Sequence, residues 1–378
     1  MNIVHISPIV YLDRIITSFD LARTQAKMGH NVTVIGANRG DKSVKEIAIN
    51  DKLRVYLLPS MNFSYLPNVS NSPYVMGLPN IIEKLKPDIL HIQTHLNFTA
   101  IKAVFTARKF GIPAITTIHG VIARVNPLVD LGQWAYLYTL GGIIFKSSHK
   151  VICLTKHDSF EIMRLGCPAN KTIVIPNGVD IELFKPSGDQ EDSLVVWHGR
   201  FVPAKGLEYL IGAASSIVRR GRSKVKFALV GDGPLETKIA TMTKNLKLTK
   251  NIVFVGRLSL RDVALFLGRA SIYVLPSLRE GMPWSLLEAM ASAVPVVGSD
   301  IPGINDVVSQ GDNGILVPPR NPEALADAIL TLMADRDLRR KLGQNARRLM
   351  VEKYSWAEIT ARIEEIYREA IARSGKSS

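Results

Sequence analysis

Two carboxylates and two cations in the second half of the chain have types and spacings that suit ligand chemistry. Glu280 and Glu288 lie eight positions apart in the peptide EGMPWSLLE, and Arg200 and Lys205 lie upstream of them. Carboxylates accept hydrogen bonds from hydroxyl groups, whereas a paired Arg and Lys can clamp a diphosphate. Simpler interpretations stand beside these. Ser285 and Glu288 also fit a capping box, and the other three side chains could be solvated loop charges.

The elements around these residues would place them at one edge of a sheet. Residues 271–276 are typical of a buried strand and residues 285–293 of a helix, so Glu280 should lie in the connecting loop and Glu288 early in the helix. Such loops follow the carboxyl ends of parallel strands, where open α/β sheets bind ligands, and a helix N-terminus suits a phosphate. Lys205 is expected in the first turn of the next helix after residues 194–198, where a bound anion would offset its unfavourable interaction with the helix dipole.

The first half offers one histidine in a comparable place. His119 precedes Gly120 at the end of the strand expected over residues 114–118. His91 and His95 are four apart on a strand and loop with no evident third ligand, so we expect no metal site. The chain has no Walker A motif, no G-x-G-x-x-G and no G-x-S-x-G.

Apolar segments with strand and helix patterns alternate along the whole chain. Strands are expected at 3–6, 32–35, 54–58, 88–92, 114–118, 151–154, 172–175, 194–198, 225–230, 252–255, 272–275, 294–297 and 315–317. Helices are expected at 15–28, 73–85, 98–110, 128–146, 157–165, 207–219, 235–246, 261–267, 285–293 and 322–333, with further helices to about 372. This rhythm indicates parallel sheets covered on both faces, in two doubly wound α/β domains.

The polar residues 176–192 mark the boundary between the two domains. We expect an N-terminal Rossmann-like domain over residues 1–178, to which the last helix, about 355–378, returns. Residues 179–354 would form the C-terminal Rossmann-like domain. Ligands would bind in the cleft across which the two domains face each other.

Composition limits the classes of function. The 378 residues are 47% hydrophobic and 21% charged, with a net charge of +14 that both halves share. A broad positive field suits a phosphorylated small molecule or an anionic membrane face, and the chain lacks the motifs typical of nucleic-acid binders. Cys153 and Cys167 form no metal spacing and are expected to be inert core thiols of a reducing compartment. We expect the first residues to form a strand rather than a signal peptide, and no apolar run reaches the 20 or so residues that a bilayer requires.

Taken together, the motifs resemble the retaining GT-B glycosyltransferases of family 4, the glycosyl transferases group 1 type. The resemblance covers nearly the whole chain, and its most specific part is the order of the Arg200 and Lys205 pair and the Glu280 and Glu288 pair. The other motifs that carry it are Gly29-His30-Asn31-Val32, His119-Gly120, Ile175-Pro176-Asn177-Gly178-Val179-Asp180, Gly199, Gly206, Gly231-Asp232-Gly233-Pro234, Gly256-Arg257, Ala289-Met290-Ala291 and Pro295 to Asp300.

The resemblance implies a role for each matching residue. Arg200 and Lys205 would hold the diphosphate of a nucleotide sugar such as a UDP- or GDP-sugar and stabilise the leaving charge in place of a metal ion. Glu288 would bind the ribose and Glu280 the donor sugar. The backbone of Gly281, Met282 and Pro283 would contact sugar and phosphate, Gly256 and Arg257 would line the base, and His119 would approach the reacting centre.

The implied reaction is hexosyl transfer with retained anomeric configuration, without cofactor or metal. No covalent nucleophile stands out, so front-face attack is the hypothesis. One departure concerns residues 7–14, SPIVYLDR, where the family usually has a Gly-Gly loop. Side chains hinder close backbone approach to a phosphate, so Arg14 could contribute instead, or the loop could shape a different acceptor site.

Alternatives remain at this point. A GT-B nucleotide-sugar epimerase and a non-catalytic nucleotide-sugar binding protein share the expected fold. For a transferase, the acceptor would be a glycan, a lipid or a small molecule. The site of action would be the cytoplasm, including the inner face of the membrane. Trp134, Tyr136, Tyr138 and residues 143–145 suit contact with an anionic membrane, but they suit an ordinary buried helix equally well.

Overall fold

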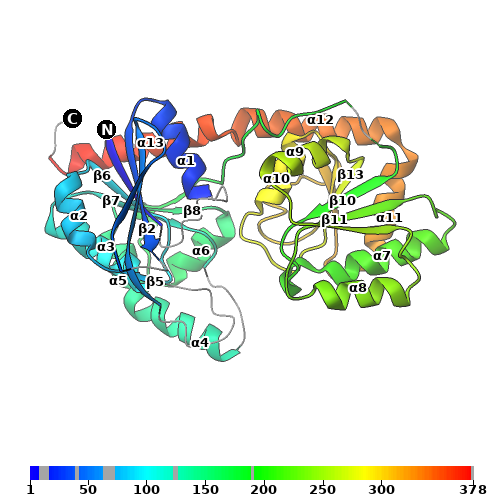
Figure 1. The fold of residues 1–378 in the computed structure, drawn as a ribbon, viewed down its shortest axis with the longest axis horizontal. Coiled ribbons are helices and arrows are strands. Elements are labelled where there is room, and N and C mark those ends of the chain that lie inside the picture. Colours follow the sequence, from blue (N-terminus) through cyan, green and yellow to red (C-terminus); the bar gives the residue numbers. More distant parts are fainter. Residues whose placement is uncertain (8–16, 39–41, 63–72, 122–126, 189–190, 376–378) are drawn as a thin grey trace. The chain divides into compact units, whose positions relative to one another are not determined.

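The computed structural model describes residues 1–7, 17–38, 42–62, 73–121, 127–188 and 191–375. The chain divides into two compact units, which Figure 1 colours along the sequence. Unit 1 comprises Met1–Asn177 and Trp356–Ser378, and unit 2 comprises Gly178–Ser355. The chain therefore leaves unit 1 once and returns to it for its last helix.

Unit 1 is built on a sheet in the order β3-β4-β2-β1-β6-β7-β8-β9, with β5 paired to β4. Its strands are β1 (Asn2–Ile6), β2 (Asn31–Asn38), β3 (Lys45–Ala48), β4 (Leu53–Asn62), β5 (Pro73–Val75), β6 (Ile89–Ile92), β7 (Ala114–Ile118), β8 (Lys150–Cys153) and β9 (Thr172–Val174). Its helices are α1 (Thr17–Lys27), α2 (Leu78–Leu85), α3 (Phe98–Lys109), α4 (Pro127–Tyr136), α5 (Gly142–Ser147), α6 (Lys156–Arg164) and α13 (Trp356–Arg373). The order, with β1 in the middle and crossovers on both sides, is doubly wound.

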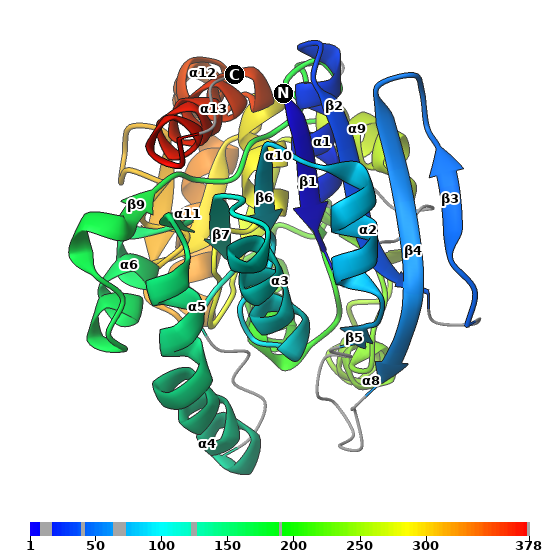
Figure 2. The ribbon, with the colours of Figure 1, turned by 90° about the vertical axis from the view of Figure 1, so that its left-hand side faces the viewer.

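Successive residues of the central strands face opposite sides of this sheet and build two cores. Ile3 packs in a cluster with α1 and α13, whereas Val4 packs with α2, α3 and α5. Figure 2 shows α2 and α3 in front of the strands, with α13 apart from them at the upper left. Tyr367 of α13 is fully buried, so the last helix is part of the core of unit 1.

Two short strands of unit 1 differ from the sequence analysis. The helix expected over residues 73–85 begins only at Leu78, and Pro73–Val75 instead pairs antiparallel with β4. Pro79 explains the late start, because proline is favoured in the first turn of a helix and disfavoured further inside. The unexpected strand β3 also pairs antiparallel with β4, so this edge of the sheet is mixed rather than purely parallel.

Unit 2 contains a second parallel sheet, in the order β12-β11-β10-β13-β14-β15. Its strands are β10 (Leu194–His198), β11 (Lys226–Val230), β12 (Ile252–Gly256), β13 (Ile272–Leu275), β14 (Val296–Ser299) and β15 (Gly314–Val317). Its helices are α7 (Leu207–Arg219), α8 (Glu236–Asn245), α9 (Leu260–Arg269), α10 (Trp284–Ala291), α11 (Pro322–Ala334) and α12 (Arg336–Lys353). Strands and helices alternate through most of the unit, and the sheet order again reverses at a central strand, β10.

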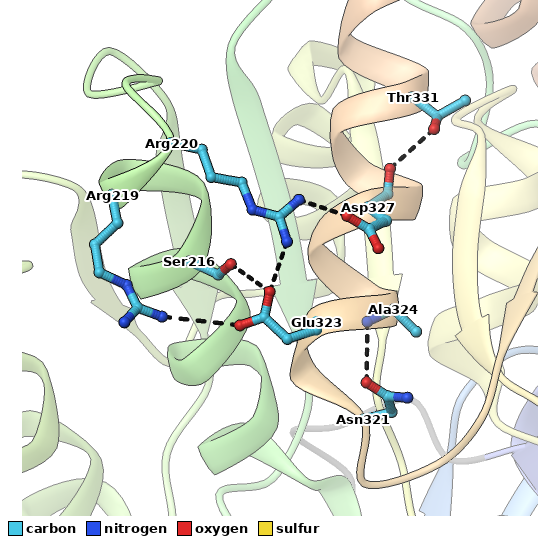
Figure 3. A network of polar contacts seen from close by, with 8 residues as sticks. All are labelled: Ser216, Arg219, Arg220, Asn321, Glu323, Ala324, Asp327 and Thr331. Carbon is cyan, nitrogen blue, oxygen red and sulfur yellow. Dashed lines mark hydrogen bonds and ion pairs between the residues drawn. The ribbon is translucent and has the colours of Figure 1, made fainter.

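A polar network on the surface of unit 2 joins α7 to α11 (Figure 3). The Glu323 carboxylate accepts hydrogen bonds from Ser216 Oγ at 2.7 Å and from Arg220 at 2.6 Å, and Arg219 lies 3.8 Å away. Arg220 also donates to Asp327. The hydrogen bond from Ser216 is the first cause that lowers the pKa of Glu323. All four charged groups are exposed, so the network orients the two helices more than it stabilises them.

Candidate functional site

The loops that follow β10, β11 and β13 are bonded to one another at the carboxyl edge of the unit 2 sheet. Phe201 N donates to Asp232 O at 2.7 Å, and Leu278 N donates to Ala204 O at 2.8 Å. These bonds join the loop after β10 to its neighbours on both sides. Parallel strands end at one edge, so side chains that are remote in the sequence meet there.

Two glycines allow this close approach of backbones. Gly206 has φ 60°, and a Cβ built on it would lie 2.1 Å from Pro276 O. Gly231 has φ 131°, and its Cβ would lie 1.9 Å from Gly199 O. Any side chain at either position would separate the loops that carry the candidate residues.

Lys205 and Glu280 form a direct ion pair at this edge. Lys205 Nζ lies 2.7 Å from Glu280 Oε1, which also accepts a hydrogen bond from Ser277 Oγ at 2.6 Å. The side chains of Lys205 and Glu280 are 19% and 8% exposed. Among the described residues, none donates a hydrogen bond to Glu280 Oε2. The pair therefore keeps one carboxylate oxygen and further ammonium protons for a ligand.

The expectation that Lys205 lies in the first turn of a helix is wrong. Pro203–Lys205 forms a single 3₁₀ turn, and α7 begins only at Leu207, after the left-handed Gly206. Gly206 breaks the helical path, so the turn aims Lys205 toward the loop after β13 instead of along α7. The ion pair with Glu280 follows from that direction.

Glu288 lies in the second turn of α10 and does not belong to a capping box. The N-cap residue of α10 is Pro283, which places Ser285 inside the first turn. Glu288 Oε2 lies 3.2 Å from His198 Nε2, at the end of β10. Burial, then the charge of Lys205, lowers the pKa of His198 to about 3. The contact with Glu288 does not have hydrogen-bond geometry, so the neutral imidazole lies against the carboxylate without donating to it in this structure.

The segment between these two carboxylates brings backbone close to the site. A Cβ on Gly303 would lie 2.1 Å from Gly281 O, so a second loop packs directly on this backbone. Met282 is buried, and Pro283 is the N-cap residue of α10. The backbone groups of residues 281–283 are therefore held in fixed positions.

The two arginines of the site differ in their partners. Arg257, after Gly256 at the end of β12, forms an exposed ion pair with Asp232 at 2.7 Å. Arg200 is exposed, and no described residue pairs with its guanidinium. Its charge is therefore available to an anion, whereas Asp232 partly offsets that of Arg257.

His119 belongs to unit 1, where it follows β7. Its Nε2 lies 3.1 Å from Gln93 Oε1, in the loop after β6. Desolvation by the surrounding residues lowers the pKa of this imidazole. The residue is nevertheless exposed at the surface of unit 1, and contact with water limits the lowering of the pKa. Of the site residues expected from the sequence, only His119 belongs to unit 1.

Three residues that contact the candidate residues were not expected from the sequence. They are His198, Ser277 and Gln93. His198 stands directly before Gly199 and Arg200, so its place at a strand end was a usable signal. Ser277 and Gln93 carry no local signal, because only the fold brings them to Glu280 and His119.

The remaining expectations concern the loop at residues 7–14, metal binding, membrane-spanning helices and the two cysteines. Of residues 7–14, the structure describes only Ser7, so the loop that departs from the family pattern lies outside the described residues. Within the described chain, no group of three or more His, Cys, Asp or Glu side chains is arranged to hold a metal. Nor does that part of the chain contain a helix long and apolar enough to cross a membrane. Cys153 and Cys167 are buried, and burial raises the pKa of both thiols.

Comparison with known families matches both halves of the chain. The model described as Glycosyl transferases group 1 matches residues 179–349, and that described as Glycosyltransferase Family 4 matches residues 17–183. An uncharacterised glycosyltransferase of Methanocaldococcus jannaschii is 33% identical over 307 residues, which are 81% of each chain. An Escherichia coli UDP-Gal:alpha-D-GlcNAc-diphosphoundecaprenol alpha-1,3-galactosyltransferase is 26% identical over 340 residues, which are 84% of each chain.

Solved structures resemble the whole chain in fold. Sucrose-phosphate synthase of Thermosynechococcus elongatus has a TM-score of 0.81 at 22% identity, over 98% of this chain and 99% of that one. The Anabaena protein HepE, solved with UDP-glucose, has a TM-score of 0.76 at 18% identity, over 98% of this chain and all of its own. These neighbours confirm the expected GT-B fold of two Rossmann-like domains.

Proposed function

The chain belongs to the GT-B glycosyltransferases of the family 4 type, and from this membership we propose that it transfers a hexose-type sugar from a nucleoside diphosphate sugar with retention of anomeric configuration. The observation that supports this most is the Lys205 to Glu280 pair at the carboxyl edge of the unit 2 sheet. A cation for phosphate and a carboxylate for hydroxyls lie within hydrogen-bond distance of each other. A sugar diphosphate carries both kinds of group next to each other.

The proposed clamp consists of Arg200 and Lys205. Arg200 offers an exposed guanidinium, and Lys205 retains donors beyond the one that it directs at Glu280. As the bond to the sugar breaks, negative charge grows on the leaving phosphate. Positioned cations stabilise that charge without reorganisation, so we propose catalysis without a metal ion.

We assign the two carboxylates to the hydroxyl groups of two different rings, the donor sugar and the ribose. Glu280 Oε2 would accept from the donor sugar, while Lys205 and Ser277 fix Oε1. Glu288, whose Oε2 lies 3.2 Å from His198 Nε2, would accept from the ribose. Gly281, Met282 and Pro283 would contact sugar and phosphate through their backbone, and the region of Gly256 and Arg257 would line the base. Unit 1 would contribute His119 to the transfer step, and the acceptor hydroxyl would attack from the face that the phosphate leaves.

For the acceptor we propose a glycan or a lipid-linked glycan, as for the Escherichia coli relative that acts on a diphosphoundecaprenol-linked sugar. One face of the α4 segment supports contact with an anionic membrane. Leu131 and Tyr138 are both 67% exposed, and the ring of Trp134 lies 6.2 Å from that of Tyr138. Two other residues that were expected there are part of the fold instead. Tyr136 donates a hydrogen bond to a backbone carbonyl, and Phe145 is fully buried.

A thermal-shift panel of UDP, GDP, ADP and their common sugars, in EDTA, tests the donor site. A ligand at about 100 times its Kd adds roughly 2.7 kcal/mol to the free energy of unfolding, a shift of several degrees. We expect one nucleotide to stabilise the wild type, and Lys205→Ala to lose most of that shift. Absence of any shift would favour a degenerate site or one that requires its acceptor first. Binding without turnover would favour a non-catalytic binding protein.

Two further assays separate the remaining alternatives. Product analysis with the donor alone distinguishes an epimerase, which would convert the sugar without an acceptor. Flotation with anionic-lipid vesicles at low salt tests the membrane, with Tyr138→Ser as the variant expected to float less. If the wild type does not float at low salt, membrane contact is excluded as a property of this chain.

A further inference from the structure

Six polar side chains lie buried in the core of unit 1 beneath His119, and none belongs to the proposed donor site. Each has at most 9% of its surface exposed. They are His5, Gln25, His91, Gln93, Thr117 and Tyr367. They come from four strand or strand-end positions and from the two helices α1 and α13. Groups of this kind are expensive to bury unless every donor meets an acceptor.

One arm of the network reaches His119 directly. Gln25 Oε1 lies 2.7 Å from His5 Nε2, and His5 Nδ1 lies 3.1 Å from Gln93 Nε2. The other end of the same amide, Gln93 Oε1, lies 3.1 Å from His119 Nε2. Because an amide nitrogen only donates, His5 accepts at Nδ1 and carries its proton on Nε2, from which it donates to Gln25.

The other arm crosses to the last helix. Gln25 Nε2 lies 3.5 Å from the Tyr367 hydroxyl, which contacts His91 Nδ1. His91 Nε2 lies 2.7 Å from Thr117 Oγ1. If Tyr367 accepts from Gln25, it donates to His91 Nδ1, and His91 then donates from Nε2 to Thr117. The five groups between the ends, His119 and Thr117, therefore each donate once and accept once along the chain.

This arrangement couples the orientations of all members. One amide turned round alone would bring two donors or two acceptors face to face in a buried site. Only a reversal of the whole chain would satisfy every contact again. Burial lowers the pKa of His5 to about 4, the Gln25 contact opposing it in part, and burial lowers the pKa of His91 well below 6.5. Both rings are therefore neutral at neutral pH, as the alternation of donors and acceptors requires.

We propose that Gln93 is a positioning residue for the transfer reaction. Its carbonyl holds His119 with the proton on Nε2, and the buried chain from His5 to Tyr367 fixes the direction of that amide. The basic atom of the His119 ring is then Nδ1. Through Tyr367, the last helix helps to set the tautomer of a residue at the end of β7. The inference rests on the proposed function only in that it assigns His119 a part in transfer.

Gln93→Met and Gln93→Glu form a matched pair that tests this in the full-length enzyme. Methionine keeps the volume but removes both contacts. We expect kcat to fall about tenfold to a hundredfold, while KM for the nucleotide sugar stays near the wild-type value, because a misplaced group costs rate more than donor binding. Glutamate keeps an acceptor for His119 Nε2–H and should restore much of kcat. It offers no donor to His5, whose proton should therefore move from Nε2 to Nδ1.

Nitrogen-15 histidine NMR reads the tautomers without reference to activity. In the wild type, the His119 Nε2–H resonance should be observed and slow to exchange with solvent. In Gln93→Met that protection should be lost, and in Gln93→Glu it should remain while His5 changes tautomer. His95 Nε2 donates to the Val121 carbonyl outside the network, so its spectrum is the internal control. Tyr367→Phe supplies a second variant. In it, His91 and His5 should each populate both tautomers instead of one.

The outcomes separate the two proposals. Unchanged His119 and His5 spectra in every variant would overturn the positioning role, even if His119→Ala abolishes transfer and so supports the proposed function. A changed His119 spectrum with undiminished transfer in Gln93→Met would support the network and overturn the part given to His119. Loss of protection together with a fall in kcat, and rescue by glutamate, would support both.

Discussion

The two units place their polar side chains in opposite ways. Unit 1 buries neutral groups in its core, where His5 and His91 are satisfied by amides and hydroxyls. Unit 2 keeps charged groups in loops at the carboxyl edge of its sheet, where Lys205 meets Glu280. Neutral groups can be buried when each hydrogen bond is made, whereas charges are tolerated where a partner or a ligand compensates them. The edge of unit 2 is therefore suited to bind a charged ligand, and the core of unit 1 to hold one residue in position.

The largest expected effect comes from breaking the ion pair of unit 2. Lys205→Ala and Glu280→Ala should each lower transfer by about a thousandfold or more, because each removes a group proposed to stabilise developing charge or to bind the donor sugar. Turnover measured with the preferred donor checks this. Lys238→Ala, on the exposed face of α8, is the matched control and should remain active.

The fold should survive these substitutions, as circular dichroism can verify. Removal of one partner leaves the other charge largely buried, but Ser277 still donates to Glu280 in the lysine variant. Turnover close to wild type in either variant would refute the assignment of the site.

The second effect is a loss of stability in unit 1 as the pH falls. The pKa of His5 is about 4 in the folded state and 6.5 ordinarily, and burial also lowers the pKa of His95 to about 4. Below pH 6.5 the unfolded chain binds protons that the folded unit rejects, so the free energy of unfolding falls from pH 6.5 toward 4 and is unaffected above that range. Each such histidine should lower the free energy of unfolding by on the order of 3 kcal/mol as the pH falls through this range.

Hydrogen exchange resolved to peptides of the whole chain, corrected for the intrinsic effect of pH, measures this loss. Strands β1, β6 and β7 should lose protection before β10 and β13, because unit 2 contains one comparable histidine, His198. The exposed His157 provides the control, since His157→Gln should leave the profile unchanged. Equal loss in both units would contradict the contrast between them.

A smaller effect is expected at Glu288. His198→Leu should weaken binding of the preferred nucleoside diphosphate about tenfold, because it replaces the polar ring beside the Glu288 carboxylate with an apolar side chain and leaves that charge less well solvated. Calorimetric titration measures the Kd. His198→Gln retains a donor and should bind more tightly than the leucine variant. If leucine binds as well as wild type, His198 does not supply a polar environment that nucleotide binding at Glu288 requires.

The smallest effect is expected in the surface network between α7 and α11 (Figure 3). Glu323→Gln removes an exposed charge that Ser216, Arg219 and Arg220 share, and solvent and salt screen such contacts. We expect no measurable change in transfer and little change in the melting temperature. A loss of transfer would show that this face, too, takes part in function.

Much of the fold was predictable from local pattern. Strands β7, β10 and β13 and helix α7 have the bounds expected from the sequence, because continuous apolar runs and periodic stripes are written in neighbouring residues. The same locality explains the errors. The strands β3 and β5 are short and depend on pairing with β4, which no local pattern records.

The sequence by itself singled out Arg200, Lys205, Glu280, Glu288 and His119 as candidates, through their types, their order and their places near strand ends. Only the tertiary structure decided their partners. Glu280 meets Lys205, Glu288 meets His198, and His119 is joined through Gln93 to a helix near the end of the chain. The physical reason is that strand order, rather than distance along the chain, determines which loops become neighbours, and hydrogen bonds form only between groups that the strand order has brought together.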